Sequence, residues 1–152
     1  MLVLTFQIGD DTLAIDIRGV REVVPRVCLR HVSGAPDWHA GVFVYRGAVV
    51  PVVDLHRLAG AEPCPPYLSS RIILIAPQQG NGRLIGLLAS QVAATRELSL
   101  EGQATNRASS DGVNFGVLIA DGKGVLRIFD PEQFLPDAEL RKLLDLPNGA
   151  GP

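Results

Sequence analysis

The sequence has few cysteines and few aromatic residues. Its 152 residues include two cysteines, Cys28 and Cys64, and 5% aromatic residues against 47% hydrophobic residues overall. The two cysteines lack the short spacing of a metal site, so we expect reduced structural thiols, and nothing in their placement supports a disulfide. With so few rings available, we expect a core built from aliphatic side chains.

Charge of one sign and long apolar runs are also missing. The chain has 14 basic and 16 acidic residues, a net charge of −2, and no basic block. Nonspecific nucleic-acid binding needs clustered Lys and Arg that displace counterions, so we expect no nucleic-acid partner. The first apolar run ends at Ile8, is too short to span a membrane and has no positively charged start. We therefore expect neither a signal peptide nor a membrane anchor.

Sequence motifs of catalysis are absent too. There is no nucleophile elbow, phosphate-binding loop or dinucleotide fingerprint, and Gly122-Lys123-Gly124 is flanked by strands, as in a hairpin turn. His39, Asp54 and His56 could in principle meet at a metal, but a strand-terminal cap and two surface histidines explain them more simply. The sequence thus predicts no catalytic residue, metal or cofactor and favours a binding module.

The most informative stretch runs from Gly41 to Gly60. Residues 42–45 and 48–53 are two apolar runs on either side of Arg46-Gly47, a pattern that predicts a β-hairpin. Pro51 lacks an N–H donor, so it places its strand at a sheet edge or at a bulge. We expect Asp54 to end the strand and cap a short helix over residues 55–58, closed by Gly60.

Arg46 is the candidate binding residue of this hairpin. An arginine presented on a rigid β-platform is suited to anchor a protein partner. A turn arginine that simply contacts solvent is the more common case, and the spacing alone does not decide between the two.

Alternating apolar residues predict further strands along the chain. We expect strands over residues 2–8, 13–17, 26–32, 71–76, 83–89, 92–100, 113–120 and 125–129. Residues 18–25 fit either a helical turn or a twisted strand, and residues 36–40 fit one helical turn. Gly86 in mid-strand predicts a bulge or a close backbone approach, and residues 101–112 predict a mobile polar loop.

The C-terminal region predicts a helix. Asp130 can cap it, Pro131 suits its first position, and Leu140, Leu143 and Leu144 share one face. About ten strands without crossover helices favour an all-β fold with a few short helices, built as two small barrels. A proline-rich connector, residues 61–70, predicts the boundary between residues 13–66 and residues 67–135, which the N-terminal strand would join; residues 136–152 form the C-terminal helix and tail.

Three segments together resemble the CheW-like domain family of bacterial chemosensory systems. They are GDDTLAIDIRGVREVV, APDWHAGVFVYRGAVVPVVDL and RLIGLLASQV, and the resemblance runs from about Leu4 to Leu135. It implies a single domain of two five-stranded SH3-like β-barrels around a central apolar core. It also implies a non-catalytic, cytoplasmic adaptor at receptor arrays, without direct membrane insertion. Its partners would be a methyl-accepting chemoreceptor, the regulatory domain of a CheA-type histidine kinase, and other CheW-like domains in rings.

The resemblance also assigns partner-binding positions. Arg46 and Gly41 match the family's Arg-Gly motif, Glu22 matches its receptor- and kinase-contacting region, and Gly86 matches a mid-strand glycine. The full set is Val20, Glu22, Gly41, Arg46, Gly47, Val49, Val50, Asp54, Leu55 and Gly86.

The sequence departs from the family pattern at three places. Tyr45 replaces a leucine, Ser90 an aspartate and His39 an apolar residue. These changes leave open flagellar chemotaxis and a parallel pathway that controls surface behaviour, pili or a second messenger. The alternatives outside the family are a small metal-dependent hydrolase using His39, Asp54 and His56, and a nucleic-acid-binding small barrel.

Overall fold

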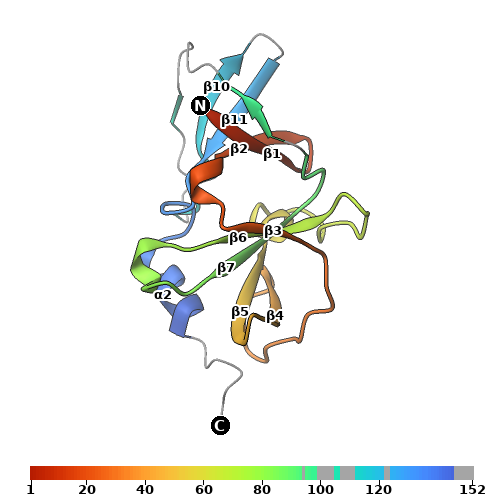
Figure 1. The fold of residues 1–152 in the computed structure, drawn as a ribbon, viewed down its shortest axis with the longest axis vertical. Helices are drawn as coiled ribbons and strands as arrows, with labels where there is room; N and C mark the ends of the chain where they lie inside the picture. Colours follow the sequence, from red (N-terminus) through yellow and green to blue (C-terminus); the bar gives the residue numbers. More distant parts are fainter. Residues whose placement is uncertain (94, 99–104, 107–111, 122–123, 146–152) are drawn as a thin grey trace.

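The computed structural model describes residues 1–93, 95–98, 105–106, 112–121 and 124–145, which form two β-sheets (Figure 1). The first sheet has the strand order β8-β1-β2-β11-β10-β9. Its strands are β1 (Leu2–Ile8), β2 (Asp11–Asp16), β8 (Thr95–Glu97), β9 (Thr105–Asn106), β10 (Val117–Asp121) and β11 (Gly124–Phe129).

The second sheet has the order β3-β6-β7-β5-β4. Its strands are β3 (Glu22–Pro25), β4 (His39–Tyr45), β5 (Ala48–Asp54), β6 (Arg71–Ile75) and β7 (Ile85–Ala89). The helices are short: η1 (Ile17–Gly19) and η2 (Gln78–Gly80) are 3₁₀ helices, and α1 (Leu55–Leu58) and α2 (Asp137–Asp145) are α-helices. Among the described residues, no helix is both long and apolar enough to cross a membrane.

The all-β, two-sheet fold is confirmed. The second sheet has the five strands expected, and the first has six because Thr105–Asn106 adds a short strand beside β10. Within the described ranges, no strand ladder joins the two edge strands of either sheet to close it into a complete barrel.

The strands are divided between the sheets differently from the prediction. The connector does not separate them, because β6 and β7, which follow it, pair with β3 and β5. Both strands are apolar on both faces, with the sequences RIILI and IGLLA. Such strands fit the middle of a sheet that is covered on both sides, and this is where the structure places them.

Three apolar clusters explain how the two sheets pack. One lies on one face of the second sheet and includes Val50, Val52 and Ile72; another lies on one face of the first sheet and includes Val3 and Leu126. The largest takes residues from both sheets and from α2, so it is the predicted central core. Although aromatic residues are scarce, this core contains Phe6, Phe129 and Phe134. The ring centroid of Phe129 lies 5.8 Å from that of Phe6 and 5.2 Å from that of Phe134.

The hairpin of β4 and β5 forms as predicted, although β5 is not an edge strand. Val42 exchanges both backbone hydrogen bonds with Arg30 on its outer side, at 2.8 and 2.9 Å. The opposite pair Val42–Pro51 is therefore a non-hydrogen-bonded pair, so Pro51 needs no N–H toward β4. The pairing of β5 with β7 begins only at Val52, and a bulge lies in β4 between His39 and Gly41. Proline fits here because no ladder bond needs its missing hydrogen.

Two local predictions before this hairpin are wrong. Residues 26–32 form no strand, only the single bridge of Arg30 to Val42. Residues 36–40 form no helical turn: residues 36–39 make a tight turn, closed by a 3.0 Å bond from His39 N–H to the Pro36 carbonyl, and β4 starts at His39. Pairing of His39 with Val53 outweighs the local helical preference. For residues 18–25 the sequence allowed a helical turn or a twisted strand, and the structure has both: the end of η1 is followed by β3.

The C-terminal helix starts later than predicted. Asp130 accepts a hydrogen bond from Glu132 N–H at 2.9 Å within a turn, while α2 begins at Asp137. Phe134 and Leu135 are buried in the central core, and placing them there requires the chain to bend before the helix. Leu140, Leu143 and Leu144 share the buried face, as predicted. Most of the predicted loop 101–112, and the hairpin turn at residues 122–123, lie outside the described residues.

Candidate functional site

The hairpin tip, residues Tyr45 to Ala48, is a tight turn with two residues in the left-handed region. Arg46 has φ +49° and Gly47 has φ +81°. Positive φ at both central residues defines a type I′ turn, whose twist matches that of the flanking strands. Such a turn prefers Asn-Gly, so an arginine at its first position is unusual. The Arg46 side chain is 77% exposed.

Tyr45 and Glu22 hold the Arg46 side chain in place. Arg46 Nη2 lies 3.2 Å from Glu22 Oε1, and the guanidinium lies over the Tyr45 ring, 5.2 Å from its centroid. The Tyr45 hydroxyl donates to the same Glu22 oxygen at 2.7 Å. This bond to a carboxylate raises the pKa of the Tyr45 phenol above its ordinary value. The result is a cation with a defined direction on a mostly exposed surface.

An apolar side chain lies next to this cation. Val44 is 69% exposed on β4, and Val49, opposite it on β5, is half-buried. A fixed arginine beside exposed valine offers the combination of charge and apolar contact that protein interfaces use.

A small groove lies where the two sheets meet. It has a volume of about 180 Å³ and is lined by residues 18–21, Ile75, Ala76, Pro131 and Glu132. Val20, a predicted partner-binding residue, lies here between η1 and β3. The groove and the hairpin tip both lie near the start of β3, since Arg21 lines the groove and the next residue, Glu22, binds Tyr45 and Arg46.

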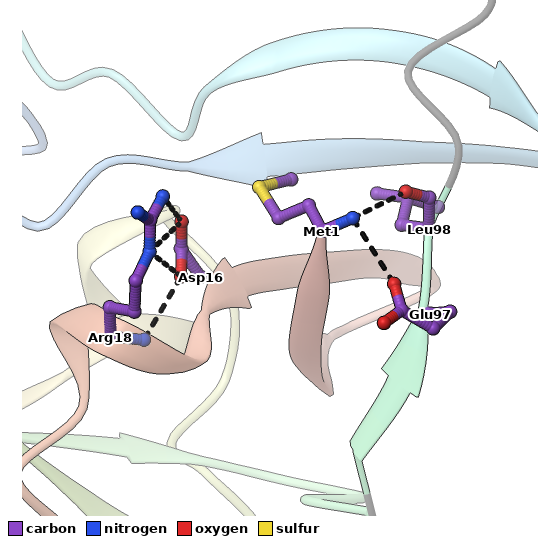
Figure 2. A network of polar contacts seen from close by, with 5 residues as sticks. All are labelled: Met1, Asp16, Arg18, Glu97 and Leu98. Atoms are coloured by element: carbon purple, nitrogen blue, oxygen red, sulfur yellow. Dashed lines mark hydrogen bonds and ion pairs between the residues drawn. The ribbon is translucent and has the colours of Figure 1, made fainter.

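Asp16 and Arg18 fix the chain as it enters this groove (Figure 2). Asp16 accepts from the Arg18 backbone N–H at 2.9 Å and from Arg18 Nη2 at 2.7 Å, which caps η1. These bonds lower the pKa of the Asp16 carboxyl below its ordinary value. Figure 2 also shows Met1 bonded to Glu97 and Leu98, which ties β1 to β8.

Half of the predicted positions are buried and can act only through the scaffold: Gly41, Val50, Asp54, Leu55 and Gly86. Gly41 has φ +133°, and a Cβ there would lie 2.7 Å from the Arg30 carbonyl oxygen. A Cβ on Gly86 would lie 2.7 Å from Ile72 Cγ2. Side chains, not backbone, approach Gly86, and the pairing of β7 with β6 runs through it without a bulge, so the prediction of a bulge or a close backbone approach is wrong. Both glycines allow neighbouring segments to pack tightly.

The three residues of the metal-site alternative are committed to other contacts. Asp54 caps α1 as predicted, accepting from His56 and Arg57 N–H through Oδ1, and it accepts from Cys64 N–H through Oδ2. His39 Nδ1 accepts from Gly41 N–H at 3.1 Å. His56 Nε2 lies 3.1 Å from the Ser90 hydroxyl, which in turn donates to the Gln7 carbonyl.

These contacts also correct the interpretation of the histidines. His39 and His56 are buried, not on the surface. Within the part of the chain that the structure describes, no group of three or more His, Cys, Asp or Glu residues could hold a metal ion. Both cysteines are free, Cys28 exposed and Cys64 buried.

Sequence reasoning missed two contributors to the tip. In the sequence Tyr45 is a departure from the family pattern; in the structure it binds both Glu22 and Arg46. Val44 looked like an ordinary strand residue. A tyrosine just before Arg-Gly was the one available signal, because its hydroxyl needs a polar partner near the strand end.

Comparisons with known proteins agree with this architecture. The family model of the CheW-like domain matches residues 2–139. "Chemotaxis protein CheW" from Treponema pallidum is 29% identical over 149 residues, covering 94% of this chain and 86% of that protein. "Probable chemotaxis protein CheW" from Rhizobium etli is 32% identical over 93 residues, covering 59% of this chain and 56% of that protein. The crystal structure of the scaffolding protein TtCheW from Thermoanaerobacter tengcongensis is similar in fold, with a TM-score of 0.72 at 20% identity, and the match covers 86% of this chain and 84% of that one.

Proposed function

Because this chain belongs to the CheW-like domain family, we propose that it is a non-catalytic adaptor that couples chemoreceptors to a CheA-type histidine kinase. Its curated relatives are named as chemotaxis proteins, and the similar solved structure is named as a scaffolding protein. The proposed place of action is the cytoplasmic face of membrane-associated receptor arrays, where other CheW-like domains in rings are further candidate partners.

The left-handed backbone of Arg46 is the observation that carries this proposal. An unfavourable φ persists only when the surrounding structure imposes it, and such residues concentrate at functional sites. Here Gly47, the Tyr45 ring and the Glu22 carboxylate all support a cation that lies largely outside the fold. We infer that Arg46 is presented for a partner, with Val44 and Val49 supplying apolar contact beside it.

An adaptor must do more than bind two partners. It transmits a signal only if its affinity differs between two states of a partner, since equal affinity for both states shifts nothing. The hairpin tip and the groove around Val20 are two neighbouring surfaces at the start of β3, lined by different residues, so one rigid sheet could carry two contacts. The receptor and the kinase regulatory domain would each take one of these surfaces.

The experiment is co-purification of the Arg46→Glu variant with the cognate receptor and kinase. Reversing the charge places a second carboxylate beside Glu22. We therefore expect retention of at least one partner to fall by about tenfold or more, the size of effect expected at an interface hot spot. Arg57→Glu is the matched control, because Arg57 is also a partly exposed arginine and its only ion pair among the described residues is a 4.0 Å contact with Asp37. Unchanged retention of both partners by Arg46→Glu would overturn the assignment of the tip.

A further inference from the structure

A second groove, which we call the α2 groove, lies between residues 33–39 and helix α2. Its volume is about 590 Å³, within the range of pockets that bind small molecules. It shares no residue with the hairpin tip or with the groove around Val20. Its apolar lining comes from Ala35, Pro36, Trp38 and Leu143.

A buried hydrogen-bond donor lies in the wall of this groove. His39 lines the groove and is 4% exposed. Its Nδ1 accepts from Gly41 N–H, so the neutral ring carries its proton on Nε2. Among the residues that the structure describes, Nε2 finds no hydrogen-bond partner. Such donors are rare in native proteins, because each has given up the hydrogen bond that water would supply.

The outer lip of the groove is less firmly held than its inner wall. The lip is the turn at residues 33–36, where the bond from Ala35 N–H to the Val32 carbonyl is long, at 3.4 Å. On the inner wall, the Trp38 carbonyl accepts from Asp54 N–H at 2.8 Å, and Trp38 packs against the central core. A small shift of the lip would therefore open a path to His39 Nε2 while Trp38 and His39 keep their places.

The charges around the groove balance one another. Glu139 pairs with Lys142 at 3.7 Å. Asp145 also lines an adjoining pocket, together with Arg83 and Arg141. No charge of one sign therefore dominates, and an ionic ligand would lose its hydration without a matching field. A neutral ligand suits this groove better.

We propose that the α2 groove binds a neutral, largely apolar small molecule that carries an acceptor oxygen, such as the carbonyl of a ketone or an amide. The oxygen accepts from His39 Nε2, and the apolar body lies against Trp38 and Leu143. Bound there, the ligand joins α2 to the first residue of β4, the strand that ends at Tyr45 beside Arg46. The proposal does not depend on a receptor or a kinase, so purified protein tests it.

The probe is prodan, a neutral naphthalene ketone whose absorption overlaps tryptophan emission. Trp38 is the single tryptophan of the chain, so prodan bound in the groove should quench Trp38 emission by energy transfer, and this quenching should saturate. The matched ligand is dimethylaminonaphthalene, which has the same rings and no ketone. We expect it to bind about tenfold more weakly than prodan does, because it leaves His39 Nε2 without an acceptor.

Two substitutions of His39 separate its donor from its structural role. In His39→Asn the side-chain oxygen can replace Nδ1 as the acceptor for Gly41 N–H, but the Nε2 donor is lost. This variant should bind both ligands equally, at the affinity of wild type for dimethylaminonaphthalene. His39→Gln places an amide N–H near the position of Nε2, so it should recover part of the preference for prodan.

Two further variants locate the site. Ala35→Phe fills the groove and should weaken both ligands by about tenfold or more. Leu68→Asp is the control for adsorption elsewhere, because Leu68 is 98% exposed and offers prodan another apolar contact; this variant should bind like wild type.

The ratio of the two affinities decides the proposal. A preference for prodan that is lost in His39→Asn and partly recovered in His39→Gln would establish it, and retained binding of dimethylaminonaphthalene by His39→Asn would show that the groove is still folded. If His39→Asn binds neither ligand, the ratio in His39→Gln decides in the same way. Quenching that does not saturate, equal affinity of wild type for both ligands, Ala35→Phe that binds like wild type, or loss of binding in Leu68→Asp would each overturn the proposal.

Discussion

The Tyr45 hydroxyl lies 2.7 Å from Glu22 Oε1, although the two residues are 23 positions apart in the sequence. The contact joins the end of β4 to the start of β3, the two edge strands of the second sheet. Arg46 approaches the same carboxylate oxygen and stacks on the Tyr45 ring. The direction of the exposed guanidinium therefore depends on a pair of residues that closes one end of the sheet.

This pair has a measurable titration. The hydrogen bond to Glu22 raises the pKa of Tyr45, so the folded state holds the phenol proton more tightly than the unfolded state does. The stabilisation is present below the ordinary tyrosine pKa of about 10 and is lost as the pH rises through the folded pKa. We expect Glu22→Gln to move the pKa of Tyr45 back toward its ordinary value. Phenolate absorbance in a Tyr67→Phe background measures Tyr45 alone, since the chain has two tyrosines; an unchanged titration curve would contradict the contact.

Gly86 is a packing requirement. In Gly86→Ala the new Cβ would lie 2.7 Å from Ile72 Cγ2 and 3.1 Å from Val52 Cγ2, inside an apolar cluster. Overpacking of this kind costs about 1–3 kcal/mol, measured as a lower midpoint of urea unfolding at unchanged slope. The control is Gly19→Ala, whose Cβ would meet Pro131 Cγ at an ordinary 3.5 Å. Equal effects of the two substitutions would show that the close approach at Gly86 does not matter.

Asp54 stabilises α1 and the start of the connector together. Its two oxygens accept three backbone N–H bonds, from His56, Arg57 and Cys64, and the residue is 5% exposed. Asp54→Ala removes a helix cap and leaves buried donors unpaired, so we expect a loss of about 2–4 kcal/mol in the free energy of unfolding. Asp54→Asn should recover part of this loss, because it keeps one carbonyl oxygen but turns the second acceptor into a donor. A stability of Asp54→Ala equal to wild type would contradict the capping role.

Local sequence signals predicted the features that depend on neighbouring residues. The hairpin around Arg46-Gly47 and the cap at Asp54 each follow from a few adjacent side chains, and both form as expected. Signals of that kind failed where distant pairing decides the outcome. His39 joins a strand because Val53 pairs with it, and α2 starts late because Phe134 enters the central core.

The arrangement of the site could not be predicted in the same way. Strand β6 pairs between β3 and β7 because its two apolar faces are both covered there. The alternation of apolar residues in the sequence does not show which strands will pair. The Glu22–Tyr45 contact and the groove between residues 33–39 and helix α2 each join segments far apart in the chain. The resemblance to a family supplied Glu22 and Arg46 as separate positions, and only the structure brings them together with Tyr45.

His39 makes the fold sensitive to mild acid. Burial lowers the pKa of His39 below its ordinary value of about 6.5. Below that pH the unfolded chain binds a proton that the folded chain resists, so the free energy of unfolding falls as the pH drops from about 6.5 toward the folded pKa. We expect wild type to lose more stability between about pH 7.5 and pH 5.5 than His39→Gln does. The charge of His31 also lowers this pKa, by less than burial does, so His31→Gln should reduce the loss of stability less than His39→Gln does. Identical losses in wild type and His39→Gln would contradict the prediction.

Two substitutions at Arg46 can separate partner binding from stability. Both remove the guanidinium, but the new residues differ in how well they accept a positive φ. Arg46→Ala loses the contacts to Glu22 and Tyr45 and introduces an alanine, which is poorly suited to φ +49°. Arg46→Asn loses the same contacts but introduces a residue that accepts the left-handed region and favours the type I′ turn. We expect Arg46→Asn to be the more stable of the two by about 1 kcal/mol in urea unfolding, while both variants retain the partner that binds the tip equally poorly. If Arg46→Asn instead retained partners as well as wild type does, the turn conformation and not the cation would be what those partners recognise.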